Sequence, residues 1–297
     1  MNVRNQISRH LLPWVAVVLS IGTLPIAAAD TPRSTTFDLP PPAPDGFAWE
    51  IVPELSDEFS GTTLDERKWL PKHPDWKGRE PSIYDPSNVS VKDGMLHLRN
   101  TTRLKTLDGV KNPEKDVWVQ SACVSSRDRI ASYGYYAARM KASRICMTSS
   151  FWFQGEHTEI DVVEQFGLSA KNPEEKMLML MNTHYFPQGW DTDKATPQRW
   201  QMPTSSGEAF HVYGVWWKDE KTVWMYHDGQ KVAEITTGGP FKEPQYLFFD
   251  TEVFVWEGLP TIESLNDSAR NTMLVDWVRA WKLVKKGNAG EKNRATR

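Results

Sequence analysis

The chain has 297 residues, of which 39% are hydrophobic, and a formal net charge of -3. A chain of this size can bury a large core, and its slightly acidic balance excludes the polycationic surface that nucleic-acid binding requires. Tryptophan is unusually frequent, with 14 residues. Indole rings pack in protein cores and also stack on the apolar faces of sugar rings, so the excess is compatible with a carbohydrate cleft.

The first 29 residues have the pattern of an export signal. Arg4 and Arg9 precede an apolar stretch at 11–26, which ends in three alanines before Asp30. This order of basic, apolar and small residues predicts a signal peptide at 1–29, and hence a secreted or periplasmic protein without a membrane span after cleavage. An uncleaved anchor is the alternative, which two prolines within the apolar stretch disfavour.

The next segment, 30–48, is rich in Pro, Ser and Thr and predicts an extended linker. We expect one folded domain at 49–284. Residues 285–297 are polar and basic without periodicity, which predicts a disordered tail. The sequence has no internal repeats, and the protein is expected to be a monomer.

Short apolar or alternating runs follow one another through the predicted domain. They predict β-strands at 95–98, 117–124, 133–142, 177–181, 212–217, 223–226, 231–235 and 274–283. The pairs Asp93-Gly94 and Asp228-Gly229 are typical hairpin connectors. Helical periodicity is nearly absent, so the pattern predicts an all-β domain, either a two-sheet sandwich or a barrel.

Two cysteines, Cys123 and Cys146, occur in a chain that is predicted to be exported, where a disulfide is chemically permitted. If 120–126 pairs in a hairpin with 133–141, Cys123 lies opposite the middle of the second strand and Cys146 lies beyond its end. This geometry favours two buried thiols over a disulfide.

The segment T-E-I-D-V-V-E-Q, 158–165, places three carboxylates in an apolar strand. Because strand residues alternate faces, Glu159 and Asp161 project to the same side. Glu164 projects to the other side unless Val162 or Val163 is an extra, bulged residue that restores the register. With that bulge, all three acids line one groove. A separation of about 5 to 5.5 Å between the two outer carboxyl groups suits a retaining glycosidase.

In this hypothesis each acid has its own role. Glu159 is the nucleophile, and Glu164 is the acid and base that protonates the departing oxygen and then deprotonates the incoming water. Asp161 is auxiliary, because its charge raises the pKa of Glu164 and its carboxyl group can hydrogen-bond to Glu159. The alternative is a solvated strand face whose acids pair with lysine or arginine.

The sequence around the acids is more specific than their spacing. Residues 149–167, S-S-F-W-F-Q-G-E-H-T-E-I-D-V-V-E-Q-F-G, resemble the catalytic strand pair of family-16 glycoside hydrolases, whose signature is E-[I/L]-D-x-x-E or E-[I/L]-D-x-E. Segments similar to the β-agarase and β-porphyranase branch are H-P-D-W-K-G-R-E-P-S (73–82), N-V-S-V-K-D-G (88–94), N-T-H-Y (182–185), F-D-T-E (249–252) and V-D-W-V-R (275–279). The resemblance covers 54–284 and implies a β-sandwich jelly roll of two curved antiparallel sheets with a concave substrate cleft.

The resemblance also implies substrate contacts. Trp76 and Arg79 lie in a polar loop, where an indole can stack on a galactose ring and a guanidinium can bind hydroxyls or sulfate. Trp152 is expected to face the same cleft. His184 and Glu252 occupy positions that bind sugar hydroxyls near the cleavage point in agarase-like enzymes. The alternatives are a salt bridge for Arg79, core packing for Trp152 and a satisfied structural histidine.

No cofactor is expected for catalysis, since no cluster of His or Cys in the sequence suggests catalytic zinc. The resemblance implies a structural calcium ion on the convex face, held by the Gly94 backbone carbonyl and the Asp276 carboxylate. The alternative is that Asp276 pairs with Arg279.

Three functions compete at this stage. The leading hypothesis is a secreted, endo-acting retaining hydrolase that cleaves β-1,4 linkages of the red-algal galactans agarose or porphyran, so that the expected partner is an agar-type polysaccharide. A second keeps the fold and acids but acts on carrageenan-type galactan or β-1,3-glucan, and the loop 76–79 favours the agar type. The third is a non-catalytic, lectin-like carbohydrate-binding protein, which would be expected to lose one of the outer acids.

Overall fold

The computed structural model describes residues 37–287. The predicted signal peptide, the first part of the predicted linker and the tail from 288 onwards lie outside this range. The first strand begins at Phe47, two residues before the predicted domain start, and the Trp49 indole nitrogen donates a hydrogen bond of 2.7 Å to the Pro41 carbonyl. No helix within 37–287 has the length and apolar character that a membrane crossing requires.

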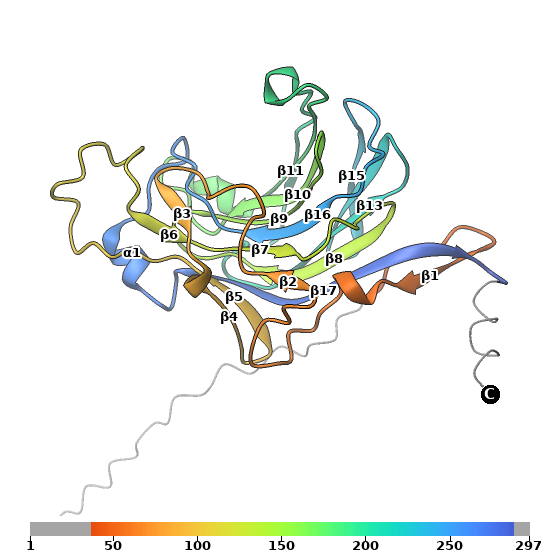
Figure 1. Ribbon diagram of the computed structural model, residues 1–297, viewed down its shortest axis with the longest axis horizontal. Helices are drawn as coiled ribbons and strands as arrows, with labels where there is room; N and C mark the ends of the chain where they lie inside the picture. Colours follow the sequence, from red (N-terminus) through yellow and green to blue (C-terminus); the bar gives the residue numbers. More distant parts are fainter. Residues whose placement is uncertain (1–36, 288–297) are drawn as a thin grey trace, which may run out of the picture. The chain divides into compact units, whose positions relative to one another are not determined.

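Two large antiparallel sheets make up the domain (Figure 1). The eight-stranded sheet has the order β15 (Gln230–Thr236), β14 (Thr222–His227), β13 (His211–Trp217), β8 (Gly134–Lys141), β17 (Thr272–Lys285), β5 (Met95–Arg99) and β4 (Val89–Lys92), and β1 (Phe47–Ile51) also pairs with β17. The seven-stranded sheet has the order β12 (Gln198–Gln201), β11 (Leu178–Tyr185), β10 (Thr158–Phe166), β9 (Thr148–Gln154), β16 (Tyr246–Asp250), β7 (Cys123–Ser126) and β2 (Trp69–Leu70).

The remaining elements are short. Strands β3 (Ser82–Tyr84) and β6 (Val119–Ser121) form a parallel pair. The helical segments are η1 (Pro53–Leu55), η2 (Pro86–Asn88), η3 (Pro173–Met177), η4 (Trp190–Thr192) and α1 (Ile262–Asn266). The expected all-β architecture is therefore confirmed.

The main core lies between the two sheets. Phe151 and Ile160 of the seven-stranded sheet belong to the same buried cluster as Tyr213, Val215 and Val278 of the eight-stranded sheet. Since alternate residues of a strand face opposite sides, the inward residues fill this core, and the outward residues of β9, β10, β11 and β16 are left to form the other face of their sheet. The acids of β10 lie on that other face.

The structure corrects one strand prediction. The run 117–124 is divided into β6 and β7, and β7 pairs with β2 and β16. The predicted hairpin between 120–126 and 133–141 is wrong, because β8 pairs with β13 and β17 in the other sheet. Every residue of β7 is buried, so its sequence carries no alternation that would indicate a partner strand.

The thiols nevertheless have the state that was expected. Cys123 and Cys146 are both buried and free. Cys123 packs in a cluster with Trp152 and Phe248, whereas the Cys146 thiol lies 3.4 Å from the Glu257 carbonyl oxygen.

Candidate active site

A β-bulge in β10 determines where the three acids point. On the side of β9, Asp161 pairs with Trp152 and Val163 pairs with Phe151. A step of two residues along β10 therefore corresponds to a step of one residue along β9. Opposite β11 the register shifts at the same place. Val162 is therefore the extra residue, and both it and Val163 are buried in the core cluster.

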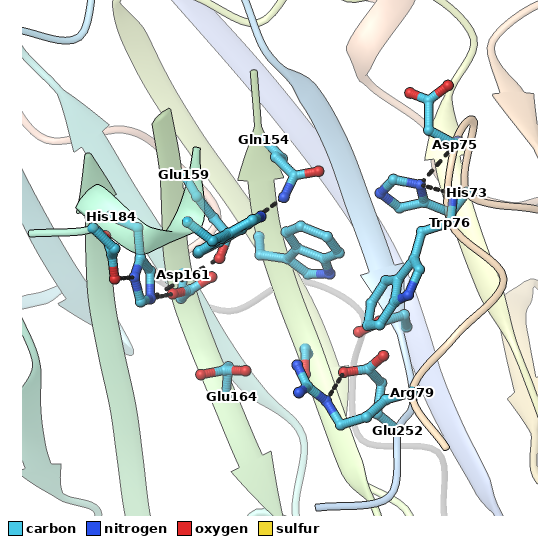
Figure 2. Close-up of a pocket in the computed structure, with 15 residues that line it drawn as sticks. His73, Asp75, Trp76, Arg79, Gln154, Glu159, Asp161, Glu164, His184 and Glu252 are labelled. Atoms are coloured by element: carbon cyan, nitrogen blue, oxygen red, sulfur yellow. Dashed lines mark hydrogen bonds and ion pairs between the residues drawn. The ribbon is translucent and has the colours of Figure 1, made fainter. Parts of the chain in front are cut away.

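The bulge brings Glu159, Asp161 and Glu164 to the same face of the seven-stranded sheet, where they line a cavity of about 670 Å³ (Figure 2). The same cavity is lined by all the substrate-contact residues predicted from the sequence: Trp76, Arg79, Trp152, His184 and Glu252. The site thus joins side chains from β9, β10, β11, the end of β16 and the loop before β3.

Glu159 is held on one side by an amide. It is 9% exposed, and the Gln154 side-chain nitrogen donates a hydrogen bond of 2.6 Å to its Oε2. Burial raises the pKa of Glu159 well above its usual value, and the Asp161 charge adds to this effect. His184 and the Gln154 hydrogen bond act in the opposite direction and favour the carboxylate. The hydrogen bond also fixes the direction of the carboxyl group.

His184 lies among three carboxylates. Its Nδ1 is 2.7 Å from Asp193 Oδ2, and its Nε2 is 3.3 Å from Asp161 Oδ2 and 4.0 Å from Glu159 Oε1. Burial alone would lower the pKa of His184, but its contacts with Asp161 and Asp193 and the charge of Glu159 raise that pKa to about 10. An imidazolium at neutral pH supplies positive charge that these acids need in a buried cavity.

Glu164 has an environment that favours its protonated form. Burial raises its pKa well above the usual value, and the charges of Asp161, Glu252 and Asp250 raise it further. Arg79 has the opposite but smaller effect. A carboxylic acid that retains its proton at neutral pH can serve as a general acid.

Arg79 lies among aromatic rings. Its guanidinium carbon is 5.0 Å from the ring centre of Phe254, 5.6 Å from Trp76 and 5.7 Å from Trp256, and its Nε donates a hydrogen bond of 3.1 Å to Glu252 Oε2. The predicted salt bridge and the predicted place in the cleft are thus both present. The side chain remains 43% exposed, so part of the guanidinium is open to a ligand.

A tyrosine hydroxyl joins two buried carboxyl groups of the site. The Tyr84 hydroxyl is 2.5 Å from Asp250 Oδ2 and 3.1 Å from Glu252 Oε1. Glu252 is also paired with Arg79, which favours its charged form. Burial, followed by the Glu252 charge, raises the pKa of Asp250 well above its usual value.

Trp152 has both of the roles considered for it. It is 7% exposed and stacks on Phe248 with a centroid distance of 4.3 Å, as a core residue would. It also lines the cavity together with the three acids. Trp76 is 37% exposed and is more accessible to a ligand.

The sequence did not single out several residues of this cavity: His73, Gln154, Trp190, Asp193 and Asp250. Trp190 is 53% exposed and stacks on Phe186 with a centroid distance of 4.1 Å. Trp190 and Asp193 belong to the segment between β11 and β12, which carries no strand pattern. His73, Gln154 and Asp250 lie within the quoted motifs, which were the signal that could have revealed them.

The predicted calcium ligands lie elsewhere. Gly94 is in the turn between β4 and β5 with a positive φ of 72°, and Asp276 lies at a bulge of β17. The buried Arg139 Nη1 is 2.6 Å from Asp276 Oδ2. Arg139 is thus one partner of Asp276. Arg279 donates hydrogen bonds of 2.7 and 3.0 Å to Glu58 and also interacts electrostatically with Asp276.

Comparison with known proteins identifies the family. A family model described as the glycoside hydrolase family 16 domain of β-porphyranases A–D matches residues 49–283. The chain belongs to glycoside hydrolase family 16. This family-16 chain is therefore a glycoside hydrolase, as predicted, and the lectin-like alternative loses its support.

Individual relatives agree with the family match. β-Porphyranase E of Zobellia galactanivorans is 36% identical over 260 residues, which cover 81% of this chain and 90% of that protein. The crystal structure of a β-porphyranase from the human gut bacterium Bacteroides plebeius has 35% identity and a TM-score of 0.72, and covers 83% of this chain and 96% of that one. β-Agarase A of Z. galactanivorans, at 22% identity with a TM-score of 0.73, covers 85% of this chain and all of the other. These likenesses confirm the jelly-roll fold.

Proposed function

We propose that this family-16 enzyme is an endo-acting, retaining hydrolase that cleaves β-1,4 linkages in the red-algal galactans agarose or porphyran. The observation that carries the proposal is the bulge at Val162, which brings Glu159 and Glu164 to one cavity with Trp76 and Arg79. The names of the relatives, β-porphyranase and β-agarase, support this class of substrate. Export to the periplasm or the medium completes the proposal, because galactans are too large to cross a membrane.

The proposed reaction is a double displacement. The Glu159 carboxylate attacks the anomeric carbon while Glu164 donates its proton to the departing glycosidic oxygen. The covalent glycosyl-enzyme is then attacked at the same carbon by water, whose proton passes to Glu164 as Glu159 leaves. His184 and Gln154 keep Glu159 oriented and favour its charged form. Two inversions at one carbon restore the original configuration.

The cation at Arg79 supports an agar-type substrate. A partly exposed guanidinium beside exposed indole rings can bind sulfate or hydroxyl groups while a galactose ring stacks on Trp76. Carrageenan-type galactan and β-1,3-glucan remain the second candidate substrates for the same acids.

A substrate panel tests this assignment. The purified mature chain is incubated with agarose, porphyran, carrageenans and laminarin, and the released oligosaccharides are sized. We expect oligosaccharides of several lengths early in the reaction from agarose or porphyran, since an endo-acting enzyme cuts inside the polymer. Release from laminarin or carrageenan alone would contradict the agar-type assignment, and release of a single short product from the start would contradict endo action.

The stereochemical course is a separate prediction. Early in hydrolysis, NMR of the anomeric protons is expected to show the β-anomer at the new reducing end, before mutarotation mixes the anomers. An initial α-anomer would exclude the double displacement and would leave Glu159 as a base that activates water.

Calcium is not part of this proposal. Calcium takes about six to eight oxygen ligands. One backbone carbonyl at Gly94 and a carboxylate already paired with Arg139 do not fit that requirement. The protein is proposed to act as a monomer.

A further inference from the structure

A second cluster of ionisable side chains lies in the eight-stranded sheet, away from the sheet that carries the acids. His211 is the first residue of β13, His227 is the last residue of β14, and Asp228 follows in the turn with a φ of 45°. Pairing of β13 with β14 brings the three residues together. Both histidines are only 4% exposed.

The three side chains converge through one atom each. His211 Nδ1 is 2.8 Å and His227 Nδ1 is 3.6 Å from Asp228 Oδ2, and the ligand atoms all lie within 4.8 Å of one another. Ligands at the corners of a tetrahedral zinc site, with bonds of about 2.0 to 2.2 Å, are about 3.3 Å apart. The two ligand atoms that lie farthest apart would therefore have to approach each other by no more than about 1.5 Å to bind one ion. Rotation of the side chains can provide this shift.

Hydrogen bonds around the cluster orient these atoms inward. Asp228 Oδ1 accepts a hydrogen bond of 2.8 Å from the Val212 backbone nitrogen, which leaves Oδ2 for the cluster. His211 Nε2 is 3.0 Å from the Thr204 hydroxyl. His211 Nδ1 itself makes a hydrogen bond of 2.8 Å to Asp228 Oδ2, and since a carboxylate only accepts, Nδ1 carries the hydrogen here. An ion would displace that hydrogen, and Nε2 would then donate to the Thr204 hydroxyl, an arrangement that supports metal-binding histidines.

Hydrogen bonding does not account for the buried position of the His227 side chain. Its Nε2 is buried without a hydrogen-bond partner among residues 37–287, and 3.6 Å from its Nδ1 to Asp228 is too long for a hydrogen bond. With the ring hydrogen on Nε2, Nδ1 presents its lone pair toward Asp228, and an ion between the two groups would give Nδ1 a partner that the carboxylate at 3.6 Å does not.

We propose that His211, His227 and Asp228 bind one divalent transition-metal ion of the zinc type. Two imidazole nitrogens and one carboxylate oxygen are a donor set that zinc accepts, with water in the fourth position. The Asp228 side chain is 28% exposed, which gives an ion a way in. The ion would join β13, β14 and their neighbouring turn, and would stabilise the fold without taking part in sugar hydrolysis.

The test uses the full-length mature protein, freed of metal by a chelator and titrated with zinc chloride in a calorimeter. We expect one equivalent to bind and the unfolding temperature to rise with zinc concentration. His227→Leu is expected to weaken zinc binding at least about 10-fold while polysaccharide hydrolysis stays unchanged. Thr204→Val, which removes the partner of His211, is expected to weaken it about 10-fold.

Two controls separate this site from others. His97→Leu changes a histidine of β5 outside the cluster and should leave binding unchanged. Glu159, Asp161 and His184 also lie close enough to hold an ion, so His184→Gln is titrated in parallel. Loss of binding in His184→Gln with retention in His227→Leu would place the ion in the cleft and overturn the proposal.

Cobalt(II) provides a readout that needs no variant. Bound at a four-coordinate site, it gives intense visible absorption bands, whereas six-coordinate cobalt in water absorbs weakly. We expect the intense bands at one equivalent, and their loss when zinc is added. A spectrum that remains that of aqueous cobalt, or the absence of saturable zinc binding, would equally overturn the proposal.

Discussion

Replacing Glu159 with alanine is expected to lower polysaccharide hydrolysis by at least about 10⁴-fold while binding of the polymer stays intact, because the variant loses the group that would form the covalent bond but keeps Trp76 and Arg79. Turnover is measured from reducing ends and binding from affinity electrophoresis. Azide is expected to restore cleavage of an activated aryl glycoside, since a small anion fits the space that the side chain leaves.

The azide product distinguishes a nucleophile from a residue that merely supports the fold. External azide attacks once, so the glycosyl azide should have the configuration opposite to that of the substrate. Glu156→Ala is the matched control, because Glu156 is an exposed acid three residues earlier and does not line the cavity. Near-normal hydrolysis by Glu159→Ala would remove Glu159 from the mechanism.

Glu164→Gln is expected to lower hydrolysis of the natural polymer by about 10² to 10⁴-fold, the usual contribution of general acid catalysis. The loss should be much smaller for formation of the glycosyl-enzyme from an aryl glycoside with a good leaving group, which departs without a proton. This step is followed as the initial burst of released phenol. Equal losses on both substrates would argue against the acid role.

The pH dependence gives a second readout of the same residue. Burial raises the pKa of Glu164, and its protonated form is the proposed acid, so activity of the unmodified enzyme is expected to fall as the pH rises through that pKa. In Glu164→Gln, which cannot lose a proton, this alkaline decline should disappear from the residual activity. An unchanged alkaline limb would assign the titration to another group, of which His184 is the nearest candidate.

Much of the fold followed from local patterns. The runs 95–98 and 177–181 predicted β5 and β11, because a half-buried strand imposes a period of two on its own sequence. The partner of β7 could not be predicted, since a strand buried on both faces has no such period. Sheet assignment depends on contacts between distant segments, which a local pattern does not contain.

Only part of the candidate site could be predicted from the sequence. The bulge at Val162 was required by the odd spacing of Glu159 and Glu164, and the structure has it. By contrast, Asp193 reaches His184 from a segment without strand pattern, and the cluster at His211 joins residues 16 positions apart in the sequence, from 211 to 227. The spacing of residues in the sequence predicts which side chains of one strand share a face. It does not predict which side chains of different strands come together when the strands pair.

The bulge in β10 has a consequence for how this strand can change over evolution. Since Val162 takes up no position opposite β9, a chain that lacked it would keep Asp161 opposite Trp152 and Val163 opposite Phe151. Glu164 would still face the sugar, four residues after Glu159 in place of five. Loss of one residue from a strand normally moves every following side chain to the opposite face. Loss of Val162 would not, so related chains could carry a strand of either length with the acids on the same face.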